Sequence, residues 1–357
     1  MKTYIKFLVN IFLNSFFYVL LIIFSLVFII NLLTELEFFK EINISVFFPI
    51  YLAFLNSPSM LFEIFPFIFL ISTQLFYIKL YTNNEIQIFK YSGLKNSKIL
   101  LITSVVTFIV GLVIISIFYN ASSNLKNFYL ELKSNYTKDS KYLAVINKNG
   151  LWIRDKINDK ILIINSSKID QNFLFNNFIT EFNSDYEVIR NIKSNKIDIK
   201  ENSWIVINPD IFTKNIKEKR DKIIIYSNFN SERINNLFSN LSSLSFLELI
   251  ELKKNYELLN YSTVDVDIQI QKIISYPLYL LLMTIFSSII MINSKKYKSD
   301  ILKILIGLFF CVIIYYFNNL FNVLGTTEKI NYIISIWTPL VLLSTIITLM
   351  THKFNEK

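Results

Sequence analysis

The chain of 357 residues contains a single cysteine, a single histidine and only five glycines. Because Cys311 has no second cysteine to pair with, an intramolecular disulfide is excluded, and the lone His352 argues against a Ser-His-Asp triad or a multi-histidine metal site. No two glycines are closer than 18 residues, so neither a Walker A loop nor a Gly-x-Gly-x-x-Gly dinucleotide motif can form. If nucleotide energy drives this protein, another chain binds the nucleotide.

Charged residues are also scarce. They make up 18% of the chain, whereas soluble domains average about 25%, and 53% of the residues are hydrophobic. Six charge-poor stretches are long enough to cross a hydrocarbon core of about 30 Å as helices. The predicted spans are Phe7–Leu33, Ser59–Leu80, Ile99–Tyr119, Ile273–Ser294, Ile304–Phe321 and Ile330–Thr351.

The second charge-poor stretch is longer than one span. It covers 42–78 with Glu63 as its one charge, and it contains Pro49 and Pro58. Proline removes a backbone hydrogen bond inside a helix, so we expect these two residues to break the stretch. Residues 44–57 are then predicted to lie in the membrane interface ahead of the second span.

The distribution of lysine indicates the orientation of the spans. If both termini are cytoplasmic, the cytoplasmic segments carry twelve basic and three acidic residues. The short loops on the other side carry two basic residues, Lys40 and Lys329, against five acidic ones. Because basic residues concentrate in cytoplasmic loops, we expect both termini in the cytoplasm and the long segment after the third span on the far side.

That long segment has the composition of a soluble domain. Residues 120–272 carry 22 basic and 19 acidic residues, and short apolar runs alternate with polar turns. The length and β-branched content of these runs predict strands. The expected strands are Tyr142–Ile146, Leu151–Arg154, Ile161–Ile164, Phe178–Phe182, Glu187–Ile192, Lys196–Ile199, Trp204–Ile207 and Ile223–Tyr226.

Two other parts of the segment are predicted not to be strands. The charged residues of 214–222 indicate a loop. Ser245 and Glu248 have the spacing of a capping box, in which each side chain bonds the other residue's backbone N–H, and they predict a helix over about 245–259.

These observations predict an α-helical integral membrane protein with six transmembrane helices and an inserted all-β domain of sandwich or jelly-roll type. The first three spans occupy residues 1–119. The β domain and its following helix occupy 120–262, and the last three spans occupy 263–357.

The cytoplasmic loop between the second and third spans predicts a short helix within 83–93. Asn83 or Asn84 can cap its first turn, where Glu85 is favourable beside the positive end of the helix dipole. Gly93 suits the left-handed position that follows the end of a helix.

This short helix has a predicted apolar face. Ile86 and Phe89 are three residues apart and therefore lie on the same side. We expect that side, together with Glu85, to be offered to a partner in the cytoplasm. The alternative is an interfacial helix that only anchors the loop.

Four stretches of the chain resemble the LptF/LptG permease family, the transmembrane subunits of the lipopolysaccharide-export ABC transporter. Residues 56–99 are similar to the family's second span and following loop, and Gly150–Asp155 (GLWIRD) resembles a strand typical of the LptG branch. Lys272–Leu278 resembles the opening of the fourth span, and Ile336–Pro339 (IWTP) resembles part of the last span. The four stretches occur in the family's order, and Asn84 stands where the family usually has serine.

The resemblance implies a multi-pass protein of the bacterial inner membrane that is not itself an enzyme and needs no cofactor. A sister permease subunit would complete a heterodimer, and a cytoplasmic ATPase dimer would drive it. The β domain would be periplasmic and would pass lipopolysaccharide to bridge proteins of similar jelly-roll fold. The helix within 83–93 would be the coupling helix, and the residues assigned to ATPase coupling are Asn84, Glu85, Ile86, Phe89 and Gly93.

The ligand implied by the resemblance is an acylated, phosphorylated glycolipid, so cations are expected near the outer interface. The candidates are Lys272 before the fourth span, Lys126 and Lys133 after the third, and Lys40 after the first. The alternative role for these lysines is snorkelling to ordinary phospholipid headgroups.

Acidic residues near the outer interface are given simpler interpretations. Glu35 and Glu37 stand where the LptG branch often has basic residues, so either phosphate capture by the first span is weakened or the substrate differs. Glu63 is interpreted as a solvated acid. Asp265 and Asp267 are interpreted as a solvated linker and not as paired catalytic carboxylates.

Three alternatives to an LptG-like permease remain at this point. The first is the sister subunit LptF. The second is a membrane-bound enzyme that modifies a lipid or glycan on the outer face, and the third is a scaffold whose β domain only binds proteins.

Overall fold

The computed structural model describes the chain except for residues 1–2, 41, 43, 46, 135, 137–150, 158–159, 171, 185, 214–215, 232–233, 235–239, 260–261, 294–298 and 356–357. The chain divides into two compact units. Met1–Tyr129 and Val264–Lys357 form the first, which we call the helical unit, and Leu130–Thr263 form the second, which we call the β unit.

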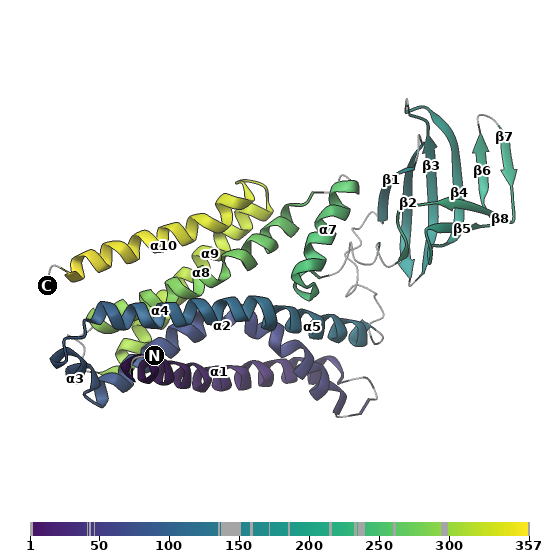
Figure 1. Cartoon of the computed structure of the whole chain (residues 1–357). Helices are drawn as coiled ribbons and strands as arrows, with labels where there is room; N and C mark the ends of the chain where they lie inside the picture. The colour runs from purple at the N-terminus through teal and green to yellow at the C-terminus, as the bar shows by residue number, and fades with distance from the viewer. Residues whose placement is uncertain are drawn as a thin grey trace. The chain divides into compact units, whose positions relative to one another are not determined.

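Within the described residues, six helical segments are long and apolar enough to cross a membrane, which confirms the six predicted spans. They are α1 (Thr3–Phe38), α2 (Phe47–Thr82), α4 (Asn96–Val113) with its continuations, α8 (Val264–Asn293), α9 (Asp300–Thr326) and α10 (Tyr332–Asn355). The short helix α3 (Glu85–Tyr91) follows α2. Figure 1 shows the start of α1, α3 and the end of α10 toward one end of the helical unit, the α3 end, and α5 toward the other, the α5 end.

The expected break in the second span is wrong, because α2 is one helix over Phe47–Thr82. Pro49 lies in its first turn, where a backbone N–H has no helical partner in any case. Pro58 lies inside the helix, but packing holds α2 together there: Ser57 is fully buried, its hydroxyl donates to Ala53 O at 2.6 Å, and it accepts from Asn31 Nδ2 of α1 at 3.1 Å. Neighbouring helices and serine hydroxyls of this kind make proline tolerable inside a span.

The third span also continues further than expected. A π-helical turn over Ile114–Phe118 leads from α4 directly into α5 (Tyr119–Ser134). The helix therefore runs past residue 120, the predicted start of the β domain, and the first part of the helical unit ends at Tyr129.

Helix α8 is the centre of the helical unit. It is the most buried span, it packs against α2, α4, α9 and α10, and α9 is the least buried span. At the contact with α4, a Cβ on Gly111 would lie 3.1 Å from Pro277 Cα, so glycine allows the two backbones to approach closely. Helix α8 starts at Val264 and includes Asp265 and Asp267 in its first turn, so these two residues are not in a linker.

The β unit is an antiparallel sheet, as expected. Its described strands are β1 (Leu151–Ile157), β2 (Lys160–Asp170), β3 (Phe173–Phe182), β4 (Val188–Asp198), β5 (Ser203–Ile207), β6 (Asp210–Thr213), β7 (Ile216–Lys219) and β8 (Lys222–Tyr226). The order is β1-β2-β3-β4-β5-β8, and β6 pairs with β4 and β7, so the sheet forks at β4. The expected strand over Tyr142–Ile146 lies outside the described residues.

One row of buried isoleucines defines the interior face of this sheet. Ile153, Ile164, Ile179, Ile192 and Ile211 are register partners in turn across β1, β2, β3, β4 and β6. Each is at most 4% exposed. β-Branched side chains directly opposite one another stabilise a sheet, and this row fixes the register of five strands.

Two details of the strand prediction are wrong. The expected strands over 187–192 and 196–199 are the single strand β4. The expected loop over 214–222 contains β7 and the first residue of β8. Every residue of β7 is exposed, so its sequence has no alternation of buried and exposed residues that would reveal a strand.

A helix follows the sheet as predicted. Helix α7 (Phe246–Leu259) begins with the expected capping box: Ser245 N donates to Glu248 Oε2 at 2.7 Å, and Glu248 N donates to Ser245 Oγ at 3.4 Å.

Candidate functional site

The first candidate site is α3, which lies between α2 and α4. Two residues, Asn83 and Asn84, separate it from α2. Asn84 has a φ of 58° and its side chain makes no capping hydrogen bond, so the predicted side-chain cap at this position is wrong. Asparagine is one of the few residues other than glycine that tolerate the left-handed conformation. Asn84 therefore acts through its backbone, which turns the chain from α2 into α3.

The other end of α3 is fixed as predicted by Gly93, which has a φ of 76°. Leu94 N donates to Phe89 O at 2.8 Å, and Gly93 N donates to Lys90 O at 3.0 Å. These two bonds are a complete Schellman motif. No atom of the described residues lies within 4 Å of a Cβ built on Gly93, so the backbone angle alone requires glycine here.

The exposed face of α3 is not the predicted one. Ile86 is 4% exposed and belongs to the core formed by α1, α2 and α4, and Phe89 packs against the same core and contacts the Phe7 ring at 6.1 Å. The helix instead exposes Ile88 (60%) and Tyr91 (91%). Helical periodicity identified an apolar face correctly, but that face holds α3 to the spans.

Glu85 is placed at the start of α3. Its Oε1 accepts from Asn83 Nδ2 at 3.4 Å, and its Oε2 has no hydrogen-bond partner among the described residues. The carboxylate is half-buried beside the N-terminus of the helix, where a negative charge is favourable. The Oε2 atom is itself buried, so this oxygen is not offered to a donor from outside the chain.

The second candidate site lies at the α5 end and is built on three aromatic rings. Phe62 of α2 stacks on Tyr276 of α8 with centroids 4.4 Å apart, and it lies 5.0 Å from the Tyr119 ring at the start of α5. The Tyr276 hydroxyl donates to the Phe62 carbonyl. Lys272 precedes Tyr276 by one helical turn and Lys126 follows Tyr119 by about two turns, so both lysines lie beyond these rings.

Glu63, the residue after Phe62, brings the two lysines into one electrostatic cluster. Its charge acts on both Lys126 and Lys272, and Asp265 also acts on Lys272. The side chain of Glu63 is exposed, in keeping with the expected solvated acid, and its charge also acts on the two lysines. Sequence reasoning missed this grouping, which requires residues from three helices to come together.

The remaining two lysine candidates are not brought into this cluster. Lys40 is exposed after the end of α1, and Lys133 is buried, with 4% exposure. An ammonium buried within the protein does not meet a lipid headgroup, so we remove Lys133 from the candidate lipid contacts. Glu35 is 1% exposed and accepts from the Tyr129 hydroxyl at 2.8 Å, so this acid is held inside the helical unit.

A comparison with protein families identifies the family to which the chain belongs. The model of the lipopolysaccharide export system permease LptF/LptG matches residues 6–353, nearly the whole chain. The chain belongs to the LptF/LptG permease family. It is therefore a lipopolysaccharide export permease, a transporter component and not an enzyme. No curated protein sequence matches the chain.

The residues that carried the family resemblance have structural roles. In the GLWIRD stretch, Asp155 is 2% exposed and accepts from Ser227 Oγ at 2.8 Å, Asn228 N at 2.9 Å and Asn228 Nδ2 at 2.7 Å. It thereby fixes the chain that leaves β8. In the IWTP stretch, Trp337 Nε1 donates to Gln271 Oε1 at 3.1 Å and joins α10 to α8.

Proposed function

We propose that this chain is an LptG-like permease subunit that extracts lipopolysaccharide from the inner membrane and is driven by a separate ATPase that docks on α3. The observation that supports this most is the geometry of α3. It is fixed at both ends, is held to the spans by Ile86, and exposes Ile88 and Tyr91, with the half-buried Glu85 at its start. An apolar contact flanked by a carboxylate suits a groove on a partner protein.

Docking is tested by co-expression with the ATPase and the sister permease. We expect the purified chain to retain the ATPase in detergent, and Glu85→Lys to uncouple ATP hydrolysis from lipid release. Asn124→Lys is the matched control, because Asn124 is exposed on α5 at the other end of the helical unit. Loss of the ATPase from the wild-type complex, or normal coupling in Glu85→Lys, would contradict the assignment.

The lysine distribution supports a cytoplasmic α3 and a periplasmic β unit. Cys311 is buried, so replacing it with serine gives a background for single-cysteine labelling. Tyr91 and Tyr226 are 91% and 69% exposed. We expect an impermeant maleimide to label Tyr226→Cys once the outer membrane is opened, and to label Tyr91→Cys only after the inner membrane is also broken. The reverse pattern would overturn the orientation.

We propose that Lys126 and Lys272 bind phosphate groups of lipopolysaccharide, with Glu63 as their counter-ion while no lipid is bound. Lys272→Gln is expected to weaken binding of phosphorylated lipid A and to leave binding of dephosphorylated lipid A unchanged. Lys254→Gln, on an exposed position of α7, is the control. An equal loss of binding for the phosphorylated and the dephosphorylated lipid would indicate that the variant disturbs packing and that Lys272 does not recognise phosphate.

The β unit is proposed to join periplasmic bridge proteins through a sheet edge. Strand β8 pairs only with β5 among the described strands, and it exposes Ile224 and Tyr226. An edge strand of this kind can accept a strand from another domain. Photo-crosslinking from Tyr226 to a jelly-roll bridge protein is the expected result, and cross-linking to lipid alone would contradict the proposal.

The second candidate function is that of the sister subunit LptF. The GLWIRD stretch, whose Leu151–Asp155 form part of β1, favours LptG. Identification of the permease that co-purifies with this chain distinguishes the two, because a heterodimer contains one subunit of each kind.

A further inference from the structure

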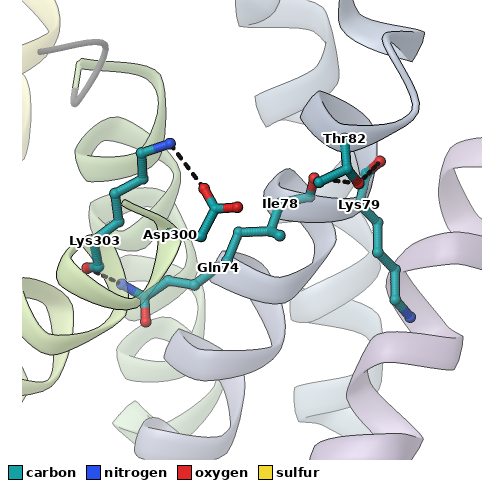
Figure 2. Close-up of polar contacts among 6 residues, drawn as sticks. All are labelled: Gln74, Ile78, Lys79, Thr82, Asp300 and Lys303. Atoms are coloured by element: carbon teal, nitrogen blue, oxygen red, sulfur yellow. Dashed lines mark hydrogen bonds and ion pairs between the residues drawn. The ribbon is translucent and has the colours of Figure 1, made fainter. Parts of the chain in front are cut away.

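A polar contact joins the last turns of α2 to the first turn of α9 (Figure 2). Gln74 of α2 is completely buried, and its Nε2 donates to the backbone carbonyl of Lys303 on α9 at 2.9 Å. The Gln74 Oε1 atom is buried with no hydrogen-bond partner among the described residues. Burying an amide inside a span costs free energy unless the amide is hydrogen-bonded. The half-bonded amide of Gln74 therefore indicates a functional role for this residue.

Gly307 leaves room for that contact. A Cβ built on Gly307 would lie 2.0 Å from Gln74 Nε2, closer than two atoms can approach. Any other residue at position 307 would therefore displace the Gln74 side chain. The buried glutamine on α2 therefore requires a glycine at the facing position of α9.

Lys303 adds a second attachment between the two helices. Its Nζ lies 3.1 Å from Asp300 Oδ1 (Figure 2) and 5.5 Å from the centroid of the Tyr81 ring on α2. Tyr81 is seven residues, or about two helical turns, from Gln74. On α9 both attachments come from Lys303, whereas on α2 they lie two turns apart, so together they hold the first turns of α9 against the last turns of α2.

We infer that the Gln74–Lys303 contact makes α9 follow the end of α2, so that a displacement of α3 reaches α9. Helix α2 ends at Thr82, and only Asn83 and Asn84 separate it from α3. Helix α9 is the least buried span, so within this chain it is among the spans least restrained by packing. Gln74 is thus a positioning residue for transport. This inference rests on the proposed docking of an ATPase on α3.

The test uses the assembled transporter with its sister permease and ATPase, reconstituted in proteoliposomes with lipopolysaccharide. Gln74→Met keeps the length of the side chain but removes the donor. We expect ATPase retention and ATP hydrolysis to stay at the wild-type level, while lipopolysaccharide released per ATP falls about 3- to 18-fold, the range set by interhelical hydrogen-bond energies in membranes.

The matched control is Ser287→Ala. Ser287 Oγ of α8 donates to Leu70 O of α2 at 2.9 Å, so this variant also removes a buried interhelical bond to α2, but not one to α9. In this variant the amount of lipopolysaccharide released per ATP hydrolysed should equal that of the wild type. Equal losses in both variants would show that the Gln74 bond serves stability only and would overturn the inference.

A second variant keeps the inference testable if Gln74→Met assembles poorly. In a Cys311→Ser background, Gln74→Cys with Gly307→Cys removes the contact, and a short bifunctional thiol reagent then joins α2 to α9. We expect low release per ATP before bridging and recovery after it. If bridging lowers release further, α2 and α9 must separate during transport and the inference is wrong. Failure of the wild-type complex to bind the ATPase or release lipid would instead reject the proposed function.

Discussion

Replacing Ile88 with alanine is expected to weaken ATPase docking without harming the fold. Ile88 is 60% exposed on α3, and full burial of an isoleucine side chain is worth about 1.5–3 kcal/mol. Covering its exposed part in a partner groove therefore contributes about 1–2 kcal/mol, and its loss should raise the Kd of the ATPase about 5- to 30-fold.

The assay is titration of purified ATPase onto the detergent-solubilised permease heterodimer. Phe128→Ala is the matched control, because Phe128 is a 42%-exposed apolar residue on α5 at the opposite end of the helical unit. Its Kd should equal that of the wild type. Ile86→Ala removes a residue that is 4% exposed, so it should lower the thermal stability of the heterodimer, a loss that Ile88→Ala should not show.

An unchanged Kd in Ile88→Ala would refute the docking surface drawn from the exposed face of α3. An equal rise in Kd for Phe128→Ala would also refute it, because the effect would then not depend on position. If Ile86→Ala alone weakened binding while stability stayed normal, the predicted face would be the docking face after all.

Three further predictions concern the fold. Asp155→Ala should destabilise the β unit by about 2–4 kcal/mol, because three donors lose a buried charged acceptor, and urea unfolding followed by tryptophan fluorescence measures this. Burial acts to raise the pKa of Glu181, but hydrogen bonds and charges from Lys160 and Arg190 outweigh burial and lower the pKa. The ionised Glu181 should therefore stabilise the fold at neutral pH, and this stabilisation should be lost as the pH falls below about 4.5. The variant Glu181→Gln should lack this stabilisation at every pH. Asn84→Val should strain the α2–α3 turn by about 1–2 kcal/mol, whereas Asn84→Gly should be tolerated, as melting temperatures will show.

The spans and the end of α3 were predictable because each depends on local sequence. Absence of charge over about 20 residues identifies a span whatever its neighbours are, and Gly93 reports a backbone angle that few residues adopt. The exposed face of α3 was not predictable, because Ile86 and Ile88 are equally apolar and only the packing of α1, α2 and α4 decides which is buried.

The contacts between helices could not be predicted either, because they also depend on how the helices pack. Lys126 and Lys272 were each proposed from the sequence, but the charge of Glu63 acts on both only because of how α2, α5 and α8 pack. A glutamine within an apolar span was the available signal for Gln74. Its partner could not be named, because a backbone carbonyl and a glycine have no signature in the sequence of α9.

The most direct test of the account is ATP-driven release of lipopolysaccharide from proteoliposomes containing this chain, its sister permease and the ATPase, measured with a soluble jelly-roll acceptor. We predict release that requires ATP and all three proteins and that Glu85→Lys abolishes although ATP is still hydrolysed. Lipopolysaccharide that stays in the bilayer while the wild-type complex hydrolyses ATP would contradict the account.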